Sequence, residues 1–264
     1  MGSLTDTQNE RDERAIAIDR VGVKELRFPI SVKDRDGSPQ RTVATVALAV
    51  DLPHHYKGTH MSRFVEVLNS HGDCLSVRDM ARLPKELLGR LDAQRAHVAF
   101  RFPFFKAKPA PVTEKVGLMD YGVVFDIDSE KDGPSVFTVT VEVPVATLCP
   151  CSKAISSYGA HNQRGTVTFA VRFSETKEPM WIEELIAIVE KSASCELYSL
   201  LKRPDEKAVT ERAYDNPVFV EDLVRNVALA AKAESRVAWF RVEAENYESI
   251  HNHNAYAVIE QQLR

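Results

Sequence analysis

The sequence contains few cysteines and no long hydrophobic run. Four of its 264 residues are cysteines, Cys74, Cys149, Cys151 and Cys195, too few for a scaffold held together by disulfides. No segment approaches the roughly 20 consecutive apolar residues of a membrane-spanning helix. The first residues, MGSLTDTQNERDER, are polar and charged and lack the apolar core of a secretory signal. We therefore expect a cytoplasmic protein with no membrane partner.

An excess of positive charge is also missing. The chain has 34 Lys and Arg against 38 Asp and Glu, a formal net charge of −4 at pH 7. This balance argues against a broad nucleic-acid-binding surface, so we expect no nucleic-acid partner. An anionic substrate would need a local basic pocket. The remaining composition, 44% hydrophobic and 27% charged, is that of an ordinary globular chain.

Hydrophobic periodicity divides the chain into a polar leader and two halves with the same order of elements. Residues 1–20 are expected to be a flexible leader, followed by modules at 21–130 and 131–264. Apolar residues alternate in the strands and recur at helical spacing in the helices. The first half is predicted to have strands at 21–32, 41–51, 95–107 and 118–128 and helices at 62–71 and 76–91. The second half is predicted to have strands near 137–143, 167–173, 237–246 and 255–261 and helices at 181–202 and 217–235.

This order, strand-strand-helix-helix-strand-strand in each half, predicts an α+β fold. The sheets would be antiparallel, with paired helices on one face. Such a sheet leaves exposed edge strands, which proteins often pair across subunits or close into a barrel. We therefore expect an oligomer.

The segment between the strands near 137–143 and 167–173 is the most informative part of the chain. It carries Cys149, Cys151, Lys153, His161 and Arg164 within about 15 residues. Thiolate and imidazole together favour zinc or another late first-row divalent metal. The spacing matches no standard zinc finger, so a pair of partly buried cysteines with a solvent-exposed histidine remains the alternative.

A second group of metal-binding residue types, His251 and His253, lies just before the last predicted strand. Two histidines at positions i and i+2 share a face in an extended segment, or simply line a turn. Together with Cys149 and His161 they favour a composite metal site built from separate elements. Catalytic metals commonly use about three protein ligands and keep one position open.

Three carboxylates each allow two interpretations. Glu196 falls on the apolar stripe of the helix predicted at 181–202, where it would be either an ion-pair member or a site residue. Glu206 lies in the charged segment after that helix and is either solvated or functional. Glu221 lies in the first turn of the next helix, where it complements the helix dipole or binds the N1–H and 2-amino group of a guanine.

The segment 57–63 precedes a predicted helix and combines glycine, hydroxyls and cations. Lys57 and Arg63, with the helix N-terminus, make a plausible anion site. A simple capped helix start, with Thr59 or Ser62 as the cap, explains the segment equally well.

Several of these segments together closely resemble the type IB GTP cyclohydrolases. The resemblance covers roughly residues 20–264, in the order expected for that family. It is carried by GTHMSRF at 58–64, LCPCSK at 148–153, GAHNQR at 159–164, CELY at 195–198, LKRPDE at 201–206, TERAY at 210–214 and ESIHNH at 248–253.

The resemblance implies a fold, an assembly and a reaction. The fold would be the tunnelling fold (T-fold), with two tandem modules per subunit, assembled into homotetramers whose barrels bring the active sites to subunit interfaces. The reaction would convert GTP and water into 7,8-dihydroneopterin triphosphate and formate, the first step of folate biosynthesis.

The resemblance also implies a set of site residues. The ligands of one divalent metal (zinc, manganese or iron) would be Cys149, His161, Glu206 and His251, with Glu196 and Glu211 as nearby alternatives to Glu206. Glu221 would anchor the purine. A histidine is needed to move protons, and His253 is our first candidate and His60 our second. The cations expected to meet the triphosphate are Lys153, Arg63, Lys202 and Arg203.

Two other functions remain open on the sequence. A T-fold 7-cyano-7-deazaguanine reductase would use Cys149 or Cys151 as a covalent nucleophile, with NADPH and no metal. A non-catalytic purine-binding or structural metal protein would perform no reaction. Release of formate from GTP separates the three hypotheses.

Overall fold

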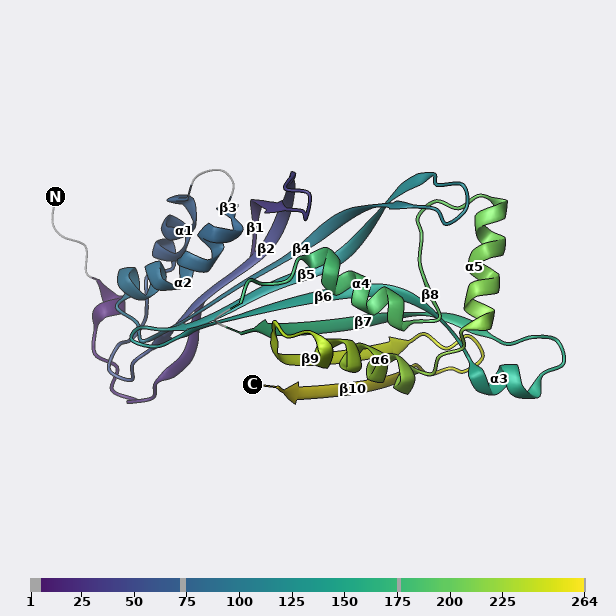
Figure 1. Ribbon diagram of the computed structural model, residues 1–264. Helices are drawn as coiled ribbons and strands as arrows, with labels where there is room; N and C mark the ends of the chain where they lie inside the picture. The colour runs from purple at the N-terminus through teal and green to yellow at the C-terminus, as the bar shows by residue number, and fades with distance from the viewer. Residues whose placement is uncertain (1–5, 72–74, 175–176, 264) are drawn as a thin grey trace. The chain divides into compact units, whose positions relative to one another are not determined.

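The computed structural model describes residues 6–71, 75–174 and 177–263 (Figure 1). Cys74 and the first five residues of the expected leader lie outside the described residues. The strands are β1 Ile18–Lys33, β2 Pro39–Leu52, β3 Leu75–Ser76, β4 Arg95–Pro109, β5 Val116–Glu130, β6 Ser135–Leu148, β7 Asn162–Phe173, β8 Cys195–Glu196, β9 Val237–Asn246 and β10 Ala255–Gln262. The helices are η1 Thr7–Asn9, α1 Met61–Asn69, α2 Val77–Leu91, α3 Pro150–Ile155, α4 Ile182–Ser192, α5 Arg203–Asp215 and α6 Val220–Ala233.

The strands form one ten-stranded sheet in the order β10-β9-β7-β6-β5-β4-β2-β1-β3, and β8 pairs with β6. The pair β1–β2 is antiparallel, as are β2–β4, β7–β9 and β9–β10, whereas the short β3 runs parallel to β1. The expected α+β class with a large antiparallel sheet is confirmed. No helix in the described part of the chain is long and apolar enough to cross a membrane.

The chain divides into two compact units, and β4, β5 and β6 contribute residues to both. Unit 1 comprises Met1–Lys33, Pro39–Phe102 and Val124–Thr138. In β2 every second residue from Ala44 to Leu52 is buried, and Val46 and Leu48 are fully buried, as the alternating sequence predicts. Helices α1 and α2 contact each other and strands β1 and β2, and α1 buries Phe64 and Leu68. The helices predicted at 62–71 and 76–91 are therefore confirmed.

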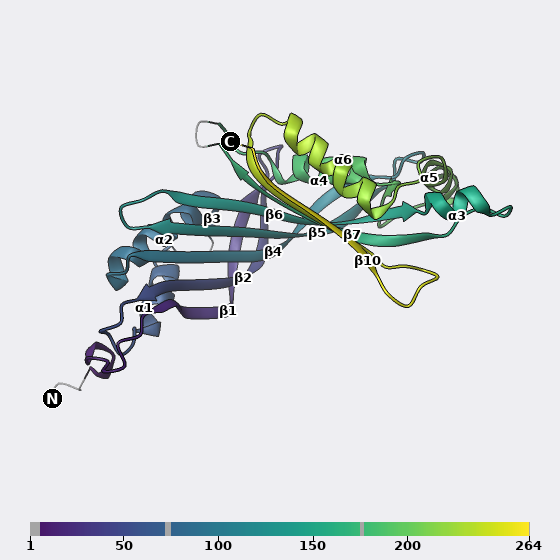
Figure 2. The same ribbon diagram turned by 90° about the horizontal axis from the view of Figure 1, so that it is seen from below.

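Unit 2 comprises Asp34–Ser38, Pro103–Val123 and Val139–Arg264. Helix α6 contacts β9 and β10, and α4 contacts β7 and α6, so both helices cover one face of these strands (Figure 2). Leu185 of α4 and Leu223 of α6 are fully buried, as are Phe169 of β7 and Val242 of β9. The backbone N–H of Val218, just before α6, donates to the carbonyl of Leu148 (3.1 Å), so the start of α6 lies beside the end of β6.

The helix predicted at 181–202 is wrong in its second half. Helix α4 ends at Ser192, and Cys195 and Glu196 instead form β8, paired with Ala146 and Val145 of β6. The Ser194 hydroxyl accepts a hydrogen bond from the backbone N–H of Leu148 (3.0 Å), which ties the chain after α4 to the end of β6. Tertiary pairing therefore overrides the apolar periodicity. Helices α3 and α5 were not predicted.

Unit 2 contains an ion-pair network centred on Arg236. Arg236 lies 3.0 Å from Glu184 and 2.8 Å from Glu234. Glu184 also accepts the backbone N–H of Trp181 at the start of α4 (2.8 Å). Hydrogen bonds from Arg236 lower the pKa of Glu234 to about 2.

This network predicts a specific loss of stability in acid. The folded pKa of Glu234 lies below its ordinary value of 4.5, so the stabilisation is complete above about pH 5 and is lost as the pH falls toward 2. Glu234→Gln should therefore reduce the difference in unfolding free energy between pH 6 and pH 3 by about 1 kcal/mol, a figure kept small because the pair is partly solvated. Urea unfolding at both pH values measures it. Arg236→Gln should act in the same direction, and an unchanged pH difference in both variants would contradict the prediction.

Candidate active site

A cavity of about 270 Å³ in unit 2 gathers residues from four separate segments of the chain. It combines the end of β6, the start of β7, the start of α6 and the loop between β9 and β10. Its lining residues are Cys149, His161, Gln163, Val218, Phe219, Val220, Glu221, Asn246, Glu248, His251, His253 and Ala255. The structure thus brings together five of the residues predicted from the sequence: Cys149, His161, Glu221, His251 and His253.

Cys149 is held at the junction of β6 and α3. It is the N-cap of α3, and Pro150 follows at the first helical position, where a missing N–H is tolerated. The Cys149 Sγ accepts a hydrogen bond from the backbone N–H of Ser152 (3.4 Å). The Cys149 N–H donates to the carbonyl of His161 (3.1 Å), so the two predicted ligands are joined through the backbone.

His161 is oriented by a short chain of polar side chains. Its Nδ1 lies 3.0 Å from Gln163 Oε1, and Gln163 Nε2 donates to Thr147 Oγ1 (2.9 Å). Ser249 Oγ lies 3.4 Å from the same Nδ1. With Nδ1 engaged, the lone pair of Nε2 is the one left for another partner.

The other cavity residues come from α6 and the loop after β9. Glu221 occupies the first turn of α6 and is exposed. His251 and His253 are exposed, and their rings stack with centroids 5.2 Å apart and an interplanar angle of 24°. Two carboxylates (Glu221 and Glu248), a thiol and three imidazoles therefore line one cavity, which is a donor set suited to metal binding and proton transfer.

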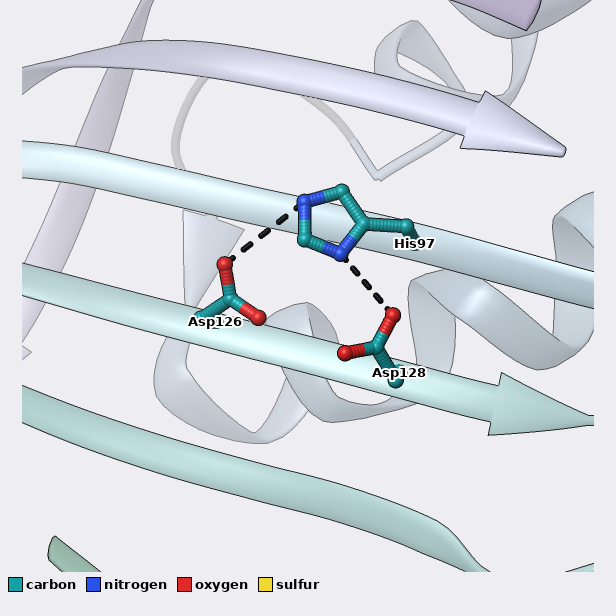
Figure 3. A group of neighbouring side chains, drawn as sticks. All are labelled: His97, Asp126 and Asp128. Atoms are coloured by element: carbon teal, nitrogen blue, oxygen red, sulfur yellow. Dashed lines mark hydrogen bonds and ion pairs between the residues drawn. The ribbon is translucent and has the colours of Figure 1, made fainter. Parts of the chain in front are cut away.

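Unit 1 contains a separate group of side chains that could hold a metal ion: His97, Asp126 and Asp128 (Figure 3). His97 Nδ1 lies 3.0 Å from Asp128 and Nε2 lies 3.5 Å from Asp126. Asp128 also pairs with Arg20 (3.0 Å). Among the residues described, this is the only group of three such side chains with ligand atoms all within 4.8 Å. Cys149, His161 and His251 therefore share a cavity without converging that closely.

Comparison with known proteins places the chain in a family. The family description "Type I GTP cyclohydrolase folE2" matches residues 4–257. A protein of Akkermansia muciniphila named GTP cyclohydrolase FolE2 is 62% identical over 265 residues, covering 100% of both chains. Its namesake from Nitrosococcus oceani is 54% identical, covering 98% of this chain and 96% of the relative. The chain belongs to the type I GTP cyclohydrolase folE2 family.

The fold is also similar to that of proteins with very different sequences. Urate oxidase from Bacillus sp. TB-90 superposes with a TM-score of 0.54 at 7% sequence identity, covering 93% of this chain and 100% of that chain. This folE2 family member thus has a tunnelling-fold-like architecture. Such low identity supports the fold alone.

The predicted ligand Glu206 lies on α5, which is anchored by its neighbour Asp205. Asp205 is fully buried and accepts hydrogen bonds from the backbone N–H groups of Val112 (2.9 Å), Thr113 (2.8 Å) and Lys202 (2.8 Å). Burial alone would raise the pKa of Asp205, but these bonds and that of the Thr113 hydroxyl hold it well below its usual range. Glu206, Lys202 and Arg203 are exposed. None of the three is among the described residues that line the cavity.

The remaining predicted cations and the second histidine candidate lie elsewhere. Lys153 donates to the carbonyl of Tyr214, and its Nζ lies 4.3 Å from the centre of the Tyr214 ring. His60, the N-cap of α1, and Arg63, in its first turn, belong to unit 1. His60 Nε2 lies 3.3 Å from Asp6 Oδ2, and Arg63 donates to the carbonyl of Arg90 (3.5 Å). In the segment 57–63, the N–H of Gly58 donates to the Gln8 carbonyl (3.1 Å).

Glu196 is a member of an ion-pair network. It lies 3.3 Å from Lys108 and 3.1 Å from Arg212, and it accepts a hydrogen bond from Tyr198. Burial by itself would raise the pKa of Glu196, but Tyr198, Lys108 and Arg212 outweigh burial and lower it. The structure thus favours the ion-pair interpretation of this carboxylate over the site interpretation.

Several polar residues of the cavity in this folE2 family member were not predicted as site residues from the sequence. Gln163 and Glu248 lie in recognised motifs but were given no role, and Asn246 was not singled out. Asn246 pairs with Gly165 across β9 and β7, and a Cβ on Gly165 would lie 2.6 Å from Asn246 Oδ1. That buried oxygen has no hydrogen-bond partner. The one available signal was the His161–Gln163 spacing, since alternate residues of a strand share a face.

Proposed function

We propose that the chain is a metal-dependent GTP cyclohydrolase that converts GTP and water into 7,8-dihydroneopterin triphosphate and formate, the first step of folate biosynthesis. Membership of the folE2 family over nearly the whole chain carries this proposal. The cavity supports it, because the thiol, imidazoles and carboxylate expected from the family motifs line one space.

The thiol and imidazoles of the cavity fit a divalent metal. Cys149 would offer a thiolate, His161 an Nε2 lone pair, and His251 a second imidazole. Glu206, the fourth proposed ligand, lies on α5 outside this cavity. Thiolate and imidazole suit zinc and iron(II), while a carboxylate also admits manganese. When bound, such a metal makes water more acidic and withdraws electrons from the carbonyl that leaves as formate.

The residues of the chain would perform the remaining tasks. Glu221 accepts the N1–H and 2-amino hydrogen bonds of guanine and so orients the base. The five-membered ring must be hydrated at C8 and opened, so protons move between water and the ring nitrogens. An imidazole nitrogen of His253 moves them, with His60 as the second candidate. Lys153, Arg63, Lys202 and Arg203 are proposed to neutralise the triphosphate.

The assembly and the location of the protein are part of the same proposal. We infer a homotetramer in the cytoplasm, with modules at 21–130 and 131–264 whose sheets close into barrels between subunits. Strand β10 ends the sheet order, and Tyr256 on it is 72% exposed, a large aromatic on an edge strand. Such edges are commonly covered by another chain. GTP is the proposed small-molecule partner.

The proposal is tested by the product formed from GTP. Chelator-stripped protein should form neopterin product, detected by fluorescence, and release formate only after zinc, manganese or iron(II) is returned. Cys149→Ala should abolish both signals. The double variant Asp126→Asn/Asp128→Asn separates the two candidate metal groups, because it removes only the unit 1 carboxylates.

The cyclohydrolase function would be rejected if protein shown to be folded and assembled formed no product with any of the three metals. Oxidation of NADPH with a nitrile substrate would then indicate the reductase, and guanine-nucleotide binding without reaction would indicate a binding protein.

A further inference from the structure

Gln163, which lines the cavity, lies between His161 of the same cavity and the buried Thr147 behind it. It is 8% exposed, and Thr147, which it contacts, is fully buried. Its amide nitrogen donates to Thr147 Oγ1 (2.9 Å), and its amide oxygen lies 3.0 Å from His161 Nδ1. Thr147 lies near the end of β6 and Gln163 near the start of β7, so this chain of contacts is fixed to the sheet on both sides.

The direction of these hydrogen bonds determines which imidazole nitrogen is free. Because the amide NH₂ of Gln163 points at Thr147, its oxygen faces the ring and accepts the hydrogen on Nδ1. The lone pair of His161 is then on Nε2. If the amide were reversed, its NH₂ would donate to Nδ1, the hydrogen would move to Nε2, and that nitrogen could not bind a metal.

We propose that Gln163 is a positioning residue that holds His161 in the tautomer and orientation needed for metal binding through Nε2. This inference rests on the proposed function, in which His161 is a metal ligand. Carboxylates often occupy the corresponding place behind metal-binding histidines. An amide carries no net charge, so it orients the ring while attracting the cation less than a carboxylate would.

Zinc affinity of the metal-free protein tests the proposal without any turnover. Zn²⁺ alone is titrated against a chromophoric chelator. Gln163→Leu should bind zinc 10–100-fold more weakly, the usual effect of losing such an outer partner. Gln163→Glu restores an acceptor for Nδ1 and should bind zinc at least as tightly as the unmodified protein. Gln94→Leu, which alters an exposed glutamine of unit 1, is the matched control and should bind zinc normally.

Further measurements separate a positioning role of Gln163 from general damage to the fold. Far-UV circular dichroism and the urea midpoint show whether each variant is folded. Thr147→Val removes only the hydroxyl that accepts the N–H of the Gln163 amide, so it should weaken zinc binding in the same direction even if Gln163→Leu folds poorly. With Co²⁺ as probe, the thiolate charge-transfer band of Cys149 should persist in Gln163→Leu at saturating metal.

The outcomes distinguish this inference from the proposed function. Zinc affinity within twofold of the unmodified protein in folded Gln163→Leu overturns the inference, as does equal weakening in the Leu and Glu variants. The inference is also overturned if the unmodified protein shows no zinc binding that is lost in Cys149→Ala. Normal zinc binding with the expected Gln163 effects, but no product from GTP, rejects the proposed function and leaves the inference standing.

Discussion

The variant His253→Ala is expected to turn over GTP about 10²–10⁴-fold more slowly than the unmodified protein while still binding its divalent metal. His253 lines the cavity, is exposed, and stacks on the ring of His251. It therefore lies beside a proposed ligand without being one of the four proposed ligands. Removing it should stop proton transfer and leave the donor set intact, so kcat should fall much more than zinc affinity.

Two matched variants make this result specific. His251→Ala should lose zinc affinity and activity together, because it removes a proposed ligand. His54→Ala changes an exposed histidine of unit 1 and should leave both quantities unchanged. Near-normal kcat in His253→Ala would exclude this histidine as the proton carrier and move the assignment to His60.

The second large effect concerns stability and falls on Lys108. Its Nζ lies 2.6 Å from Glu190 Oε1, with side chains only 7% and 5% exposed. Tyr121 donates to the same oxygen (2.7 Å), and burial together with the charge of Glu190 raises the pKa of Tyr121, so it remains a neutral donor. Lys108→Met would leave the Glu190 carboxylate buried without its close cation, since Lys106 is 4.0 Å away. We expect a loss of about 3–5 kcal/mol in unfolding free energy, measured by urea denaturation.

The controls for Lys108 use the charge balance of the same pair. Lys108→Met/Glu190→Met removes both charges and should recover part of the loss, because no buried carboxylate is left unpaired. Lys131→Met breaks an ion pair with Asp92 (2.9 Å) in which both side chains are solvent-exposed, and it should leave the stability nearly unchanged. If Lys108→Met changed the unfolding free energy as little as Lys131→Met does, the loss of the cation beside Glu190 would not destabilise the protein, and the prediction would be wrong.

The strands were predictable because their signal is local. In β9 the buried residues Phe240, Val242 and Ala244 alternate with less buried ones, and the strand predicted at 237–246 is confirmed. The same applies to the helix predicted at 217–235, where α6 buries one apolar face. A period of two or 3.6 residues can be read without knowledge of the fold.

The helix predicted at 181–202 failed for a reason that no local pattern contains. Its apolar spacing continues through Leu197, yet Cys195 and Glu196 pair with β6, a strand about fifty residues earlier in the chain. Whether Glu196 is an ion-pair member or a site residue also depended on tertiary structure, because its partner Lys108 lies on β4, far from Glu196 in the sequence.

By itself, the sequence determined the fold class, the family and the residue types available for chemistry, since periodicity and motifs are properties of short segments. Only the tertiary structure decided which of these residues share a cavity: Cys149, His161, Glu221, His251 and His253 do, and Glu206 lies on the separate α5. It also decided that the Gln163 amide stands behind His161. The physical reason is that strand pairing and helix docking bring together side chains far apart in the chain, and their hydrogen-bond directions exist only after that packing has formed.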